Sequence, residues 1–374
     1  MKIKSTLAGA AMALMTAGAS AVFAQDNPVR VAAIAPLSGP GAFDGQLAIE
    51  GMEAMVEIVN EEGGVLDGRM IELLIYDDKG NPEEGVSAAK RAIENDDVDI
   101  VVGGWFSSVA LTMKEVTRDR ILNIMTSSQH PDTTKEGHDL LFRLNATSTM
   151  MSDTYSDFIC DKMDIDSIAF ITINDDYGRL EAGNYEKLLG ECGIEFLGNE
   201  FYNKDDADFM TVLTKLRAMN PDAIYVSAIN TAQGATIYRQ IRQVGYQGTT
   251  IASAGNMNPK LVELSGPALE GVYSVSLFAP DSDDPELMAW VEQYNEMFDN
   301  EPSFIGSLGA QAVEILAQAI DKAGAVRDYE KIAETIRANE WNTLLGDITF
   351  DEIGQAQQNI YLIQINDGKI ETVN

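Results

Sequence analysis

The segment Val29–Gln46 reads VRVAAIAPLSGPGAFDGQ and passes from an apolar run into a loop of small residues and then into a helical pattern. The run Val29–Pro36 has the composition of a buried strand, and the loop Leu37–Gly45 contains three glycines and a proline. Strand, loop and helix in this order form the first unit of an open α/β sheet, which binds ligands at the loops that follow its strands. Because the unit recurs along the chain, we predict an α/β fold whose loops together form one ligand cleft.

The glycines of this loop are close to the dinucleotide-binding fingerprint G-x-G-x-x-G. The third glycine comes one residue late, so that Asp44 stands in its place, and Pro40 lacks the backbone N–H that would donate to a pyrophosphate. No acidic residue follows a second strand in the frame that a ribose would need. We therefore predict a tight loop that holds Phe43 at the mouth of a cleft, and no nucleotide.

Residues 1–24 have the pattern of a secretory signal peptide. Lys2 and Lys4 precede the apolar stretch 7–23, and Val22-Phe23-Ala24 fits the small-x-small cleavage rule, which makes Gln25 the expected mature start. A membrane anchor is the alternative, but the stretch is short and is interrupted by small and polar residues. We expect an exported protein with no later membrane span.

The chain is strongly acidic, with 59 Asp and Glu against 26 Lys and Arg and a formal net charge of −33. Loss of residues 1–24 removes two lysines and no acids, which lowers the charge to −35. Such a surface repels nucleic acid and anionic membranes, so neither is an expected partner. The acids are spread along the chain, which indicates a solvated surface rather than a cationic ligand.

About 350 mature residues exceed one hydrophobic core, so we expect two lobes. The alternation of strands and helices runs through two rounds, and the segments 99–103 and 222–226 hold equivalent places in them. We predict a doubly wound parallel sheet in each half. The other expected strands lie at 71–76, 121–125, 168–173, 194–201 and 249–252. The last third differs, with long helical patterns at 285–298 and 305–323 and short strands at 349–350, 360–365 and 370–373.

The two cysteines, Cys160 and Cys192, can pair in an exported protein. Cys160 would lie late in the helix before strand 168–173 and Cys192 at the end of the helix after it, which places both at the same edge of the sheet. A Cys160–Cys192 disulfide is one hypothesis, and two buried free thiols are the other. Together with His130 and His138 they do not make a credible zinc set, and we predict neither a metal nor a cofactor.

Six short motifs stand in a specific order and spacing. They are APLSGP at 35–40, NEEGGV at 60–65, YDD at 76–78, NDDYG at 174–178, RQIRQVG at 239–245 and GDITFD at 346–351. Together they resemble the periplasmic binding proteins of the branched-chain amino acid type, which deliver ligands to ABC transporters. The resemblance covers nearly all of residues 28–370.

This resemblance implies two lobes joined by three crossovers, which we place near 144–148, 273–278 and 345–350. Lobe one would comprise residues 27–145 and 276–346, and lobe two residues 146–275 and 347–374. The ligand would be enclosed between the lobes by a hinge motion.

The resemblance also implies ligand contacts in the loops after the strands. A serine after strand 98–102 would bind the ligand's carboxylate, which favours Ser107 and then Ser108, and a helix N-terminus there suits an anion. Tyr177 would close over the ligand from lobe two. The next loop would offer backbone groups and side chains through Ser127, Ser128 and Gln129. Apart from the resemblance, Phe43, Trp105 and Phe106 are candidates to stack on an apolar ligand body, and a position in the core is the alternative for Phe106. Helix capping is the alternative role of the serines, and packing between the lobes that of Tyr177.

Two loops of lobe two depart from the family pattern. Amino-acid binders place an acid after the strand 249–252 to hold the ammonium group, whereas this chain has Ser253-Ala254-Gly255-Asn256. The loop after 222–226 has Ala228-Ile229-Asn230-Thr231 where an aromatic residue is usual. Asn230 and Asn256 are the polar candidates in these loops. Without the acid, an α-amino group lacks its charge partner, and burying it unpaired is costly.

We therefore expect a non-catalytic solute-binding subunit of an ABC importer, which acts as a monomer and passes its ligand to a membrane permease. A branched-chain or related amino acid is the first ligand class. An aromatic or aliphatic carboxylate, a short amide or urea is the alternative, and an exported ligand sensor would share the same fold and cleft.

A secreted enzyme is the competing class. The segment nearest to a G-x-S-x-G nucleophile elbow has Ile305 where the first glycine belongs. His130 and His138 are the only imidazole bases, and the neighbouring Asp175 and Asp176 would point apart along the chain. We expect no catalytic residues.

Overall fold

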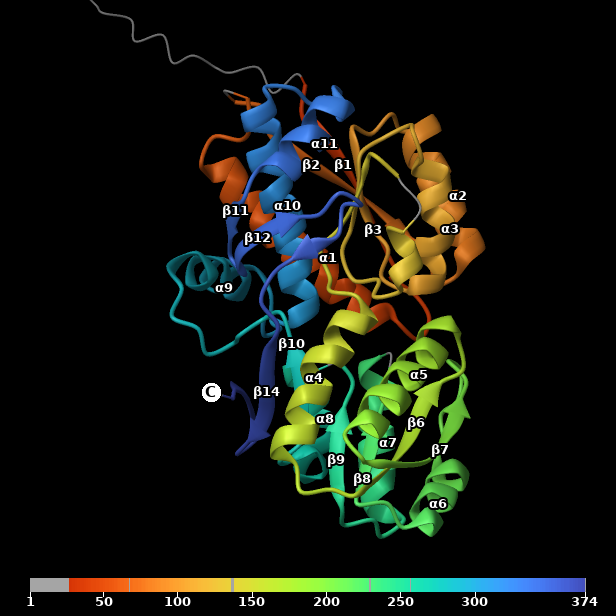
Figure 1. The fold of residues 1–374 in the computed structure, drawn as a ribbon. Coiled ribbons are helices and arrows are strands. Elements are labelled where there is room, and N and C mark those ends of the chain that lie inside the picture. Colours follow the sequence, from red (N-terminus) through yellow and green to blue (C-terminus); the bar gives the residue numbers. More distant parts are fainter. Residues whose placement is uncertain (1–26, 67, 136–137, 229, 256, 374) are drawn as a thin grey trace, which may run out of the picture.

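The computed structural model describes residues 27–66, 68–135, 138–228, 230–255 and 257–373, and it contains two lobes that lie one above the other in Figure 1. The expected signal peptide at 1–24 and the candidate Asn256 lie outside the described residues. Within the described part of the chain, no helix is both long and apolar enough to span a membrane.

Five parallel strands form the first sheet, in the order β2-β1-β3-β4-β5. They are β1 (Val29–Ala35), β2 (Ile71–Asp77), β3 (Ile100–Gly103), β4 (Asn123–Met125) and β5 (Leu141–Arg143). Apart from Arg30, every residue of β1 is buried, and β3, β4 and β5 are buried throughout. Such continuous burial is typical of parallel strands that helices cover on both faces.

Helices cover the first sheet on two sides, as Figure 1 shows. One side carries α1 (Ala42–Glu61) and α10 (Phe304–Ala323), and the other α2 (Pro82–Glu94) and α3 (Ser107–Thr117). A Cβ on Gly51 of α1 would lie 2.0 Å from the carbonyl oxygen of Gly306, so the two helices need glycine where they cross. This close crossing keeps the first residues of α10 near the loops that follow the strands. The remaining helices of this lobe are α9 (Pro285–Met297), α11 (Tyr329–Ala338) and the 3-10 turn η1 (Pro131–Thr133).

The second sheet repeats the strand order of the first, as β7-β6-β8-β9-β10. Two antiparallel strands, β14 and β15, extend it beyond β10. Its strands are β6 (Ser167–Ile173), β7 (Glu195–Tyr202), β8 (Ala223–Val226), β9 (Thr249–Ala252), β10 (Tyr273–Ser276), β14 (Tyr361–Asn366) and β15 (Lys369–Thr372). Its helices are α4 (Ser148–Lys162), α5 (Asp176–Glu191), α6 (Met210–Met219), α7 (Thr231–Gln243), α8 (Pro259–Ser265) and the 3-10 turn η2 (Gly266–Leu269).

The predicted α/β fold with a doubly wound sheet in each half is confirmed, and β3 and β8 both hold the third place in their sheets. In this strand order the chain reverses its direction of winding between two neighbouring strands of each sheet. These strands are β1 and β3 in the first sheet and β6 and β8 in the second. A ligand crevice forms at such a switch point, outside the carboxyl ends of the strands. The loops after β3 and β8 are therefore the places to look for a site.

The third crossover differs from the expected position at 345–350. The strand β12 (Gly346–Phe350) pairs with both β11 (Trp341–Thr343) and β13 (Ala356–Gln357), and Gln355 bridges to Arg143 of β5. These strands stay with lobe one, and the chain returns to lobe two between β13 and β14. Apolar alternation predicts a strand but does not say which sheet the strand joins, and for that reason the expected boundary at residue 347 comes too early.

Cys160 near the end of α4 and Cys192 directly after α5 form a disulfide. The two helices pack against each other, and the rings of Tyr155 and Tyr185 meet between them edge to face. The disulfide thus joins two helices of lobe two at the end remote from the start of α5.

Candidate ligand-binding site

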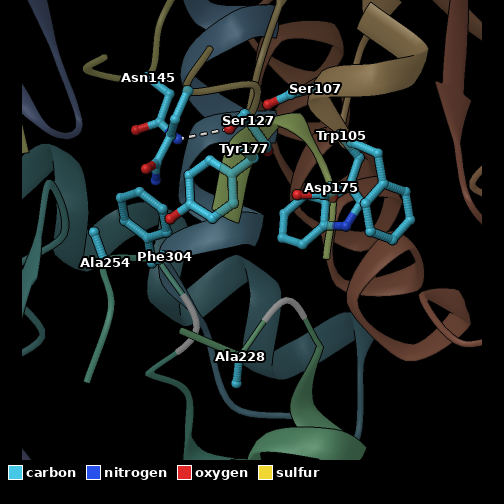
Figure 2. Close-up of a pocket in the computed structure, with 12 residues that line it drawn as sticks. Trp105, Ser107, Ser127, Asn145, Asp175, Tyr177, Ala228, Ala254 and Phe304 are labelled. Atoms are coloured by element: carbon cyan, nitrogen blue, oxygen red, sulfur yellow. Dashed lines mark hydrogen bonds between the residues drawn. The ribbon is translucent and has the colours of Figure 1, made fainter. Parts of the chain in front are cut away.

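One cavity lies between the lobes at the carboxyl ends of the strands, and Figure 2 shows its walls. Lobe one contributes Trp105, Phe106, Ser107, Ser127, Gln129, Asn145 and Phe304, and lobe two contributes Asp175, Tyr177, Ala228, Ala254 and Gly255. The volume open to the centres of water-sized molecules is about 70 Å³. This is several times what a single buried water needs, so the cavity suits a small solute.

The loop after β3 brings the N-terminus of α3 to this cavity. Gly104 has a φ of +80°, and a Cβ there would lie 2.3 Å from the sulfur of Met125. Glycine thus lets the backbone pass over β4. Phe106 holds the N-cap position of α3 and provides no side-chain hydrogen bond to the first turn. An uncapped helix N-terminus carries free N–H groups and a partial positive charge, which together form an anion site.

Ser107 is the first residue of α3, and its hydroxyl lies at this helix end. It accepts a hydrogen bond of 3.3 Å from Ser128, whose hydroxyl is also 2.9 Å from that of Thr133. Ser128 is fully buried behind the wall, so it supports Ser107 and does not line the cavity. Ser108 does not line it either. The structure therefore favours Ser107 among the candidate serines of this helix.

The loop after β4 supplies a second group of polar atoms. Ser127 and Gln129 line the cavity, and the side-chain amide of Asn145 donates to the carbonyl oxygen of Ser127 at 2.8 Å. Asn145 follows β5, where the chain crosses to lobe two, and its own carbonyl oxygen accepts from Gln355. Its Oδ1 is buried without a hydrogen-bond partner among the described residues. Asn145 thus connects the cavity wall to two of the three crossovers.

Buried Arg143 holds the same loop from below. Its guanidinium donates to Gln355 Oε1 at 2.6 Å, to Thr134 Oγ1 at 3.3 Å and to the carbonyl oxygen of His130. Burial lowers the pKa of Arg143 to about 10. The side chain remains charged at neutral pH and lies beneath the loop that carries Gln129.

Tyr177 presents its ring to the cavity and turns its hydroxyl away. The hydroxyl donates to Glu181 Oε1 at 2.7 Å, and the Tyr225 hydroxyl reaches the same oxygen at 2.7 Å. Ser227 donates to the other oxygen of Glu181. Burial raises the pKa of this carboxyl group, which the three hydroxyls stabilise. Tyr177 is therefore an aromatic wall held in place by Glu181, a residue that the sequence pattern does not single out.

Asp175 is the one carboxylate among the described residues that line the cavity. It caps α5, because its Oδ1 accepts from the backbone N–H of Gly178 at 2.8 Å. Burial raises its pKa above the ordinary value for aspartate. The other lining residues that were not predicted as ligand contacts are Asn145 and Phe304, along with Ala228, Ala254 and Gly255 of the two departing loops.

Besides Ser108 and Ser128, two more predicted contacts do not line the cavity. Phe43 lines a separate hollow with Leu47, Asn258 and Lys260. Asn230 caps α7 by accepting from the N–H of Gln233, and its amide donates to Gln233 Oε1 at 2.8 Å. Neither residue is among those that line the cavity. A loop position alone predicts proximity to a cleft, but it does not predict the direction in which a side chain points.

The lobes also contact each other directly beside the cavity. Asp44 of α1 accepts hydrogen bonds from the hydroxyl and the backbone N–H of Thr231, the first residue of α7, at 2.7 and 3.2 Å. Asp44 is fully buried, and Asn258 donates to the Thr231 hydroxyl at 2.8 Å. These bonds join residues 187 positions apart in sequence, and they hold the lobes in a closed arrangement.

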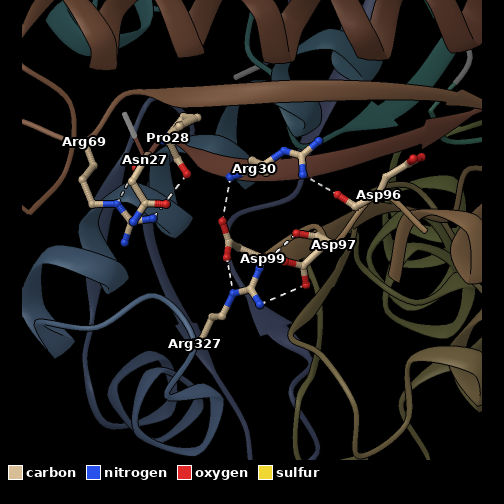
Figure 3. A network of polar contacts seen from close by, with 8 residues as sticks. All are labelled: Asn27, Pro28, Arg30, Arg69, Asp96, Asp97, Asp99 and Arg327. Carbon is tan, nitrogen blue, oxygen red and sulfur yellow. Dashed lines mark hydrogen bonds and ion pairs between the residues drawn. The ribbon is translucent and has the colours of Figure 1, made fainter. Parts of the chain in front are cut away.

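A second group of polar contacts lies in lobe one, away from the cavity, and Figure 3 shows it. Arg327 donates to Asp99 Oδ1 at 2.5 Å and to Asp97 Oδ1 at 3.1 Å, while Asp99 Oδ2 accepts from the backbone N–H of Arg30 at 2.8 Å. The contacts tie the chain after α10 to the start of β1 and the segment before β3. Their role is to hold lobe one together, and none of these residues lines the cavity.

Two sheets of like order, three crossovers and a cavity between the lobes define a two-lobed protein with a site for a small solute between its lobes. The comparisons with known proteins agree. The chain belongs to the periplasmic binding protein family, whose model matches residues 28–369. It is a non-catalytic substrate-binding protein of the kind that serves ABC importers in the periplasm.

The relatives of this chain indicate which members of the family it is similar to. The chain is 30% identical to the leucine-, isoleucine-, valine-, threonine- and alanine-binding protein of Pseudomonas aeruginosa, over 92% of this chain and 91% of the relative. Among solved structures it is similar to the leucine-binding protein LivK of Thermotoga maritima, with a TM-score of 0.84, 27% identity and coverage of 92% and 98% of the two chains. The LivJ protein of Streptococcus pneumoniae, solved with isoleucine, shares the fold with a TM-score of 0.85 at 22% identity, with 93% and 99% covered.

Proposed function

We propose that this protein binds a small amino acid with an apolar side chain between its lobes and presents it to the membrane permease of an ABC importer. The observation that carries the proposal is the uncapped N-terminus of α3, which opens into a small cavity with aromatic and alanine walls. A ligand carboxylate at Ser107 would take the free N–H groups of the helix and its partial positive charge.

The walls suit the rest of such a ligand. Trp105, Phe106, Tyr177 and Phe304 surround the space with rings, and Ala228 and Ala254 leave room on the side of lobe two. Within the described parts of the chain, no lysine, arginine or histidine lines the cavity. A helix N-terminus and hydroxyl groups would therefore bind the anion in place of a cationic side chain. The relatives named above bind leucine, isoleucine and similar amino acids, which supports the same ligand class here.

The test is isothermal titration of the purified mature protein with L-leucine, L-isoleucine, L-valine, L-threonine and L-alanine. A ligand that binds only the folded protein also raises the Tm by mass action, which gives a second readout. We expect micromolar or tighter binding of at least one of these amino acids. Binding of benzoate, acetamide or urea with no binding of any amino acid would contradict the proposal and favour the alternative ligand class.

Two further features belong to the proposal. We infer cleavage after Ala24 and a monomeric mature protein. Intact-mass measurement of the periplasmic fraction should give a chain that begins at Gln25, and size exclusion with light scattering should give the mass of a single chain. A retained leader or a stable dimer would contradict these two points without affecting the ligand class.

A further inference from the structure

The charged groups among the described residues that line the cavity are of one sign only. Asp175 provides a carboxylate, and among the described residues no cationic side chain lines the space with it. The nearest candidate on its own helix is Arg179, which instead donates to Asn174 Oδ1 at 2.9 Å and lies over the ring of Phe201. Among the described residues, no ion pair to Asp175 is formed. A partly buried carboxylate without a cation is unfavourable until a positive charge reaches it.

A negative charge suits a helix N-terminus, but helix capping does not require one. Asp175 caps α5 through one oxygen, and an asparagine makes the same cap without an ionised group. The chain uses asparagine in this way three times, with Asn81 at α2, Asn230 at α7 and Asn258 at α8, and it uses aspartate at α9 and α11, through Asp284 and Asp328. The negative charge of Asp175 beside the cavity is therefore not required for capping.

We propose that Asp175 binds the ammonium group of the ligand, so that the site selects amino acids over carboxylates that lack an amino group. The inference rests on the function proposed above and refines its ligand class. Asp175 would take over the role of an acid after β9, a position where Ala254 lines the cavity without any charge. The two charged groups of the ligand are then divided between the lobes, with the carboxylate at α3 of lobe one and the ammonium at Asp175 of lobe two.

This division has a mechanical consequence. An amino acid can be held by both lobes at once, and its binding energy then favours the closed arrangement. A ligand without the amino group binds the anion site of lobe one but leaves Asp175 buried and unpaired on closure. The site therefore discriminates by requiring that both charges be present before the lobes close.

The experiment is a double cycle between the protein carboxylate and the ligand amino group. The protein variants are Asp175→Asn, which keeps the cap, and Asp176→Asn, which removes the same charge from the neighbouring residue as a matched control. The ligand pair is L-leucine and 4-methylpentanoate, its analogue without the amino group. Kd is measured by calorimetry, lobe closure by small-angle X-ray scattering and folding by the Tm.

We expect Asp175→Asn to weaken leucine binding about 100-fold and to leave binding of 4-methylpentanoate unchanged or tighter, because loss of one partner of a desolvated charge pair is costly. Asp176→Asn should leave both affinities within about twofold of wild type, the usual size of a surface charge effect. Leucine should compact the wild type, and 4-methylpentanoate should not.

Three results would overturn the inference. Unchanged leucine affinity in Asp175→Asn would show that the carboxylate does not bind the amino group. An equal loss for both ligands would assign Asp175 a structural role. Equal binding of both ligands to the wild type would show that the site does not select for the amino group. A wild type that binds none of the amino acids of the titration panel would instead contradict the proposed function itself, so the two failures are distinguishable.

Discussion

The helices α3 and α7 hold equivalent places in the two lobes, yet their N-termini are used differently. Each follows the third strand of its sheet, and each begins with a hydroxyl residue, Ser107 in α3 and Thr231 in α7. The end of α3 has no side-chain cap and opens to the cavity. The end of α7 is capped by Asn230 and is covered by Asp44 of the other lobe.

The difference shows how one fold can serve binding and closure with the same element. A helix N-terminus attracts an anion, and in lobe one the anion would come from the ligand, whereas in lobe two the protein provides its own. Asp44 also lies in the first turn of α1, so its carboxylate is near the N-termini of two helices from different lobes. Closure is thus partly supported by a protein contact that is present without ligand.

The largest expected effect comes from adding a carboxylate at the uncapped N-terminus of α3 in lobe one. A Ser107→Asp substitution would place a carboxylate at the start of α3, where it favours the helix and repels the carboxylate of an amino acid. We expect the affinity for L-leucine to fall at least 100-fold, or about 3 kcal/mol, with the Tm unchanged or raised. Ser107→Ala is the control and should lose only about tenfold. Tight leucine binding by Ser107→Asp would show that the ligand carboxylate lies elsewhere.

The next largest effect should come from removing the Asp44 carboxylate that covers the N-terminus of α7 in lobe two. Asp44→Ala leaves the N–H and hydroxyl of Thr231 without their partner, which costs about 2 kcal/mol in a buried site. Because that contact exists only when the lobes are closed, affinity should fall about 30-fold for L-leucine, which is expected to close the lobes. Scattering should show a more open free protein.

Glu57→Ala, at an exposed position on the same helix, is the matched control for the loss of an acid. It should leave both affinity and scattering unchanged. If Asp44→Ala behaved like this control, closure would not depend on the contact at α7.

A smaller effect should follow from crowding the gap beside the cavity. Gly255 of lobe two has a φ of +90°, and a Cβ there would lie 3.1 Å from the ring of Phe304 and 3.4 Å from the Gln129 amide of lobe one. Gly255→Val should therefore hinder closure and weaken leucine binding about tenfold, or about 1.4 kcal/mol. Calorimetry measures the loss.

The control separates crowding from backbone strain. Gly193 has a nearly identical φ of +91°, and no atom lies within 4 Å of the point that a Cβ would occupy there, so Gly193→Val adds similar strain in open space. It should lower the Tm as Gly255→Val does but leave the affinity unchanged. Equal affinity losses in the two variants would attribute the effect of Gly255→Val to instability alone.

The smallest effect concerns pH. Burial raises the pKa of Asp44 from 3.8 to about 6, so the closed, folded protein binds this proton more tightly than the unfolded chain. The stability gained from that proton is complete below about pH 4 and is lost as the pH rises through 6. Opening of the lobes relieves the buried charge without unfolding, which limits the effect to about 1 kcal/mol, or about 2 °C in Tm.

The measurement compares the wild type with Asp44→Asn, which carries no titrating group at this position. The difference in Tm should shift in favour of the wild type by about 2 °C as the pH falls from 7 to 4. Asp78, whose pKa burial also raises to about 6, is present in both proteins and cancels in the difference. A constant difference across this range would show that Asp44 does not titrate there.

Much of the cavity could be predicted from strand ends. Trp105, Ser107, Ser127, Gln129 and Tyr177 were expected there, and all five line it. Each comes soon after a strongly apolar run, and the carboxyl ends of parallel strands meet at one edge of a sheet. A local pattern therefore fixes where such a residue lies along the strand direction.

Other residues of the site had no comparable signal. Phe304 reaches the cavity because α10 crosses α1 at Gly51 and Gly306, a packing that joins positions about 250 residues apart. In the sequence, Asp175 has the pattern of half a catalytic pair or of a helix cap. Its place in the cavity wall, as the one carboxylate among the described lining residues, depends on how the two lobes pack against each other.

The sequence by itself determined the alternation of strands and helices, the two-lobed α/β fold and most of the loops that line the cavity. These follow from local hydrophobic patterns, glycine positions and turn residues, which act over a few residues. Only the tertiary structure decided that Phe43 lies in a separate hollow, that Asp44 covers α7 and that β12 stays with lobe one. Those outcomes depend on which surfaces meet when two lobes pack and close, and no short stretch of sequence encodes that choice.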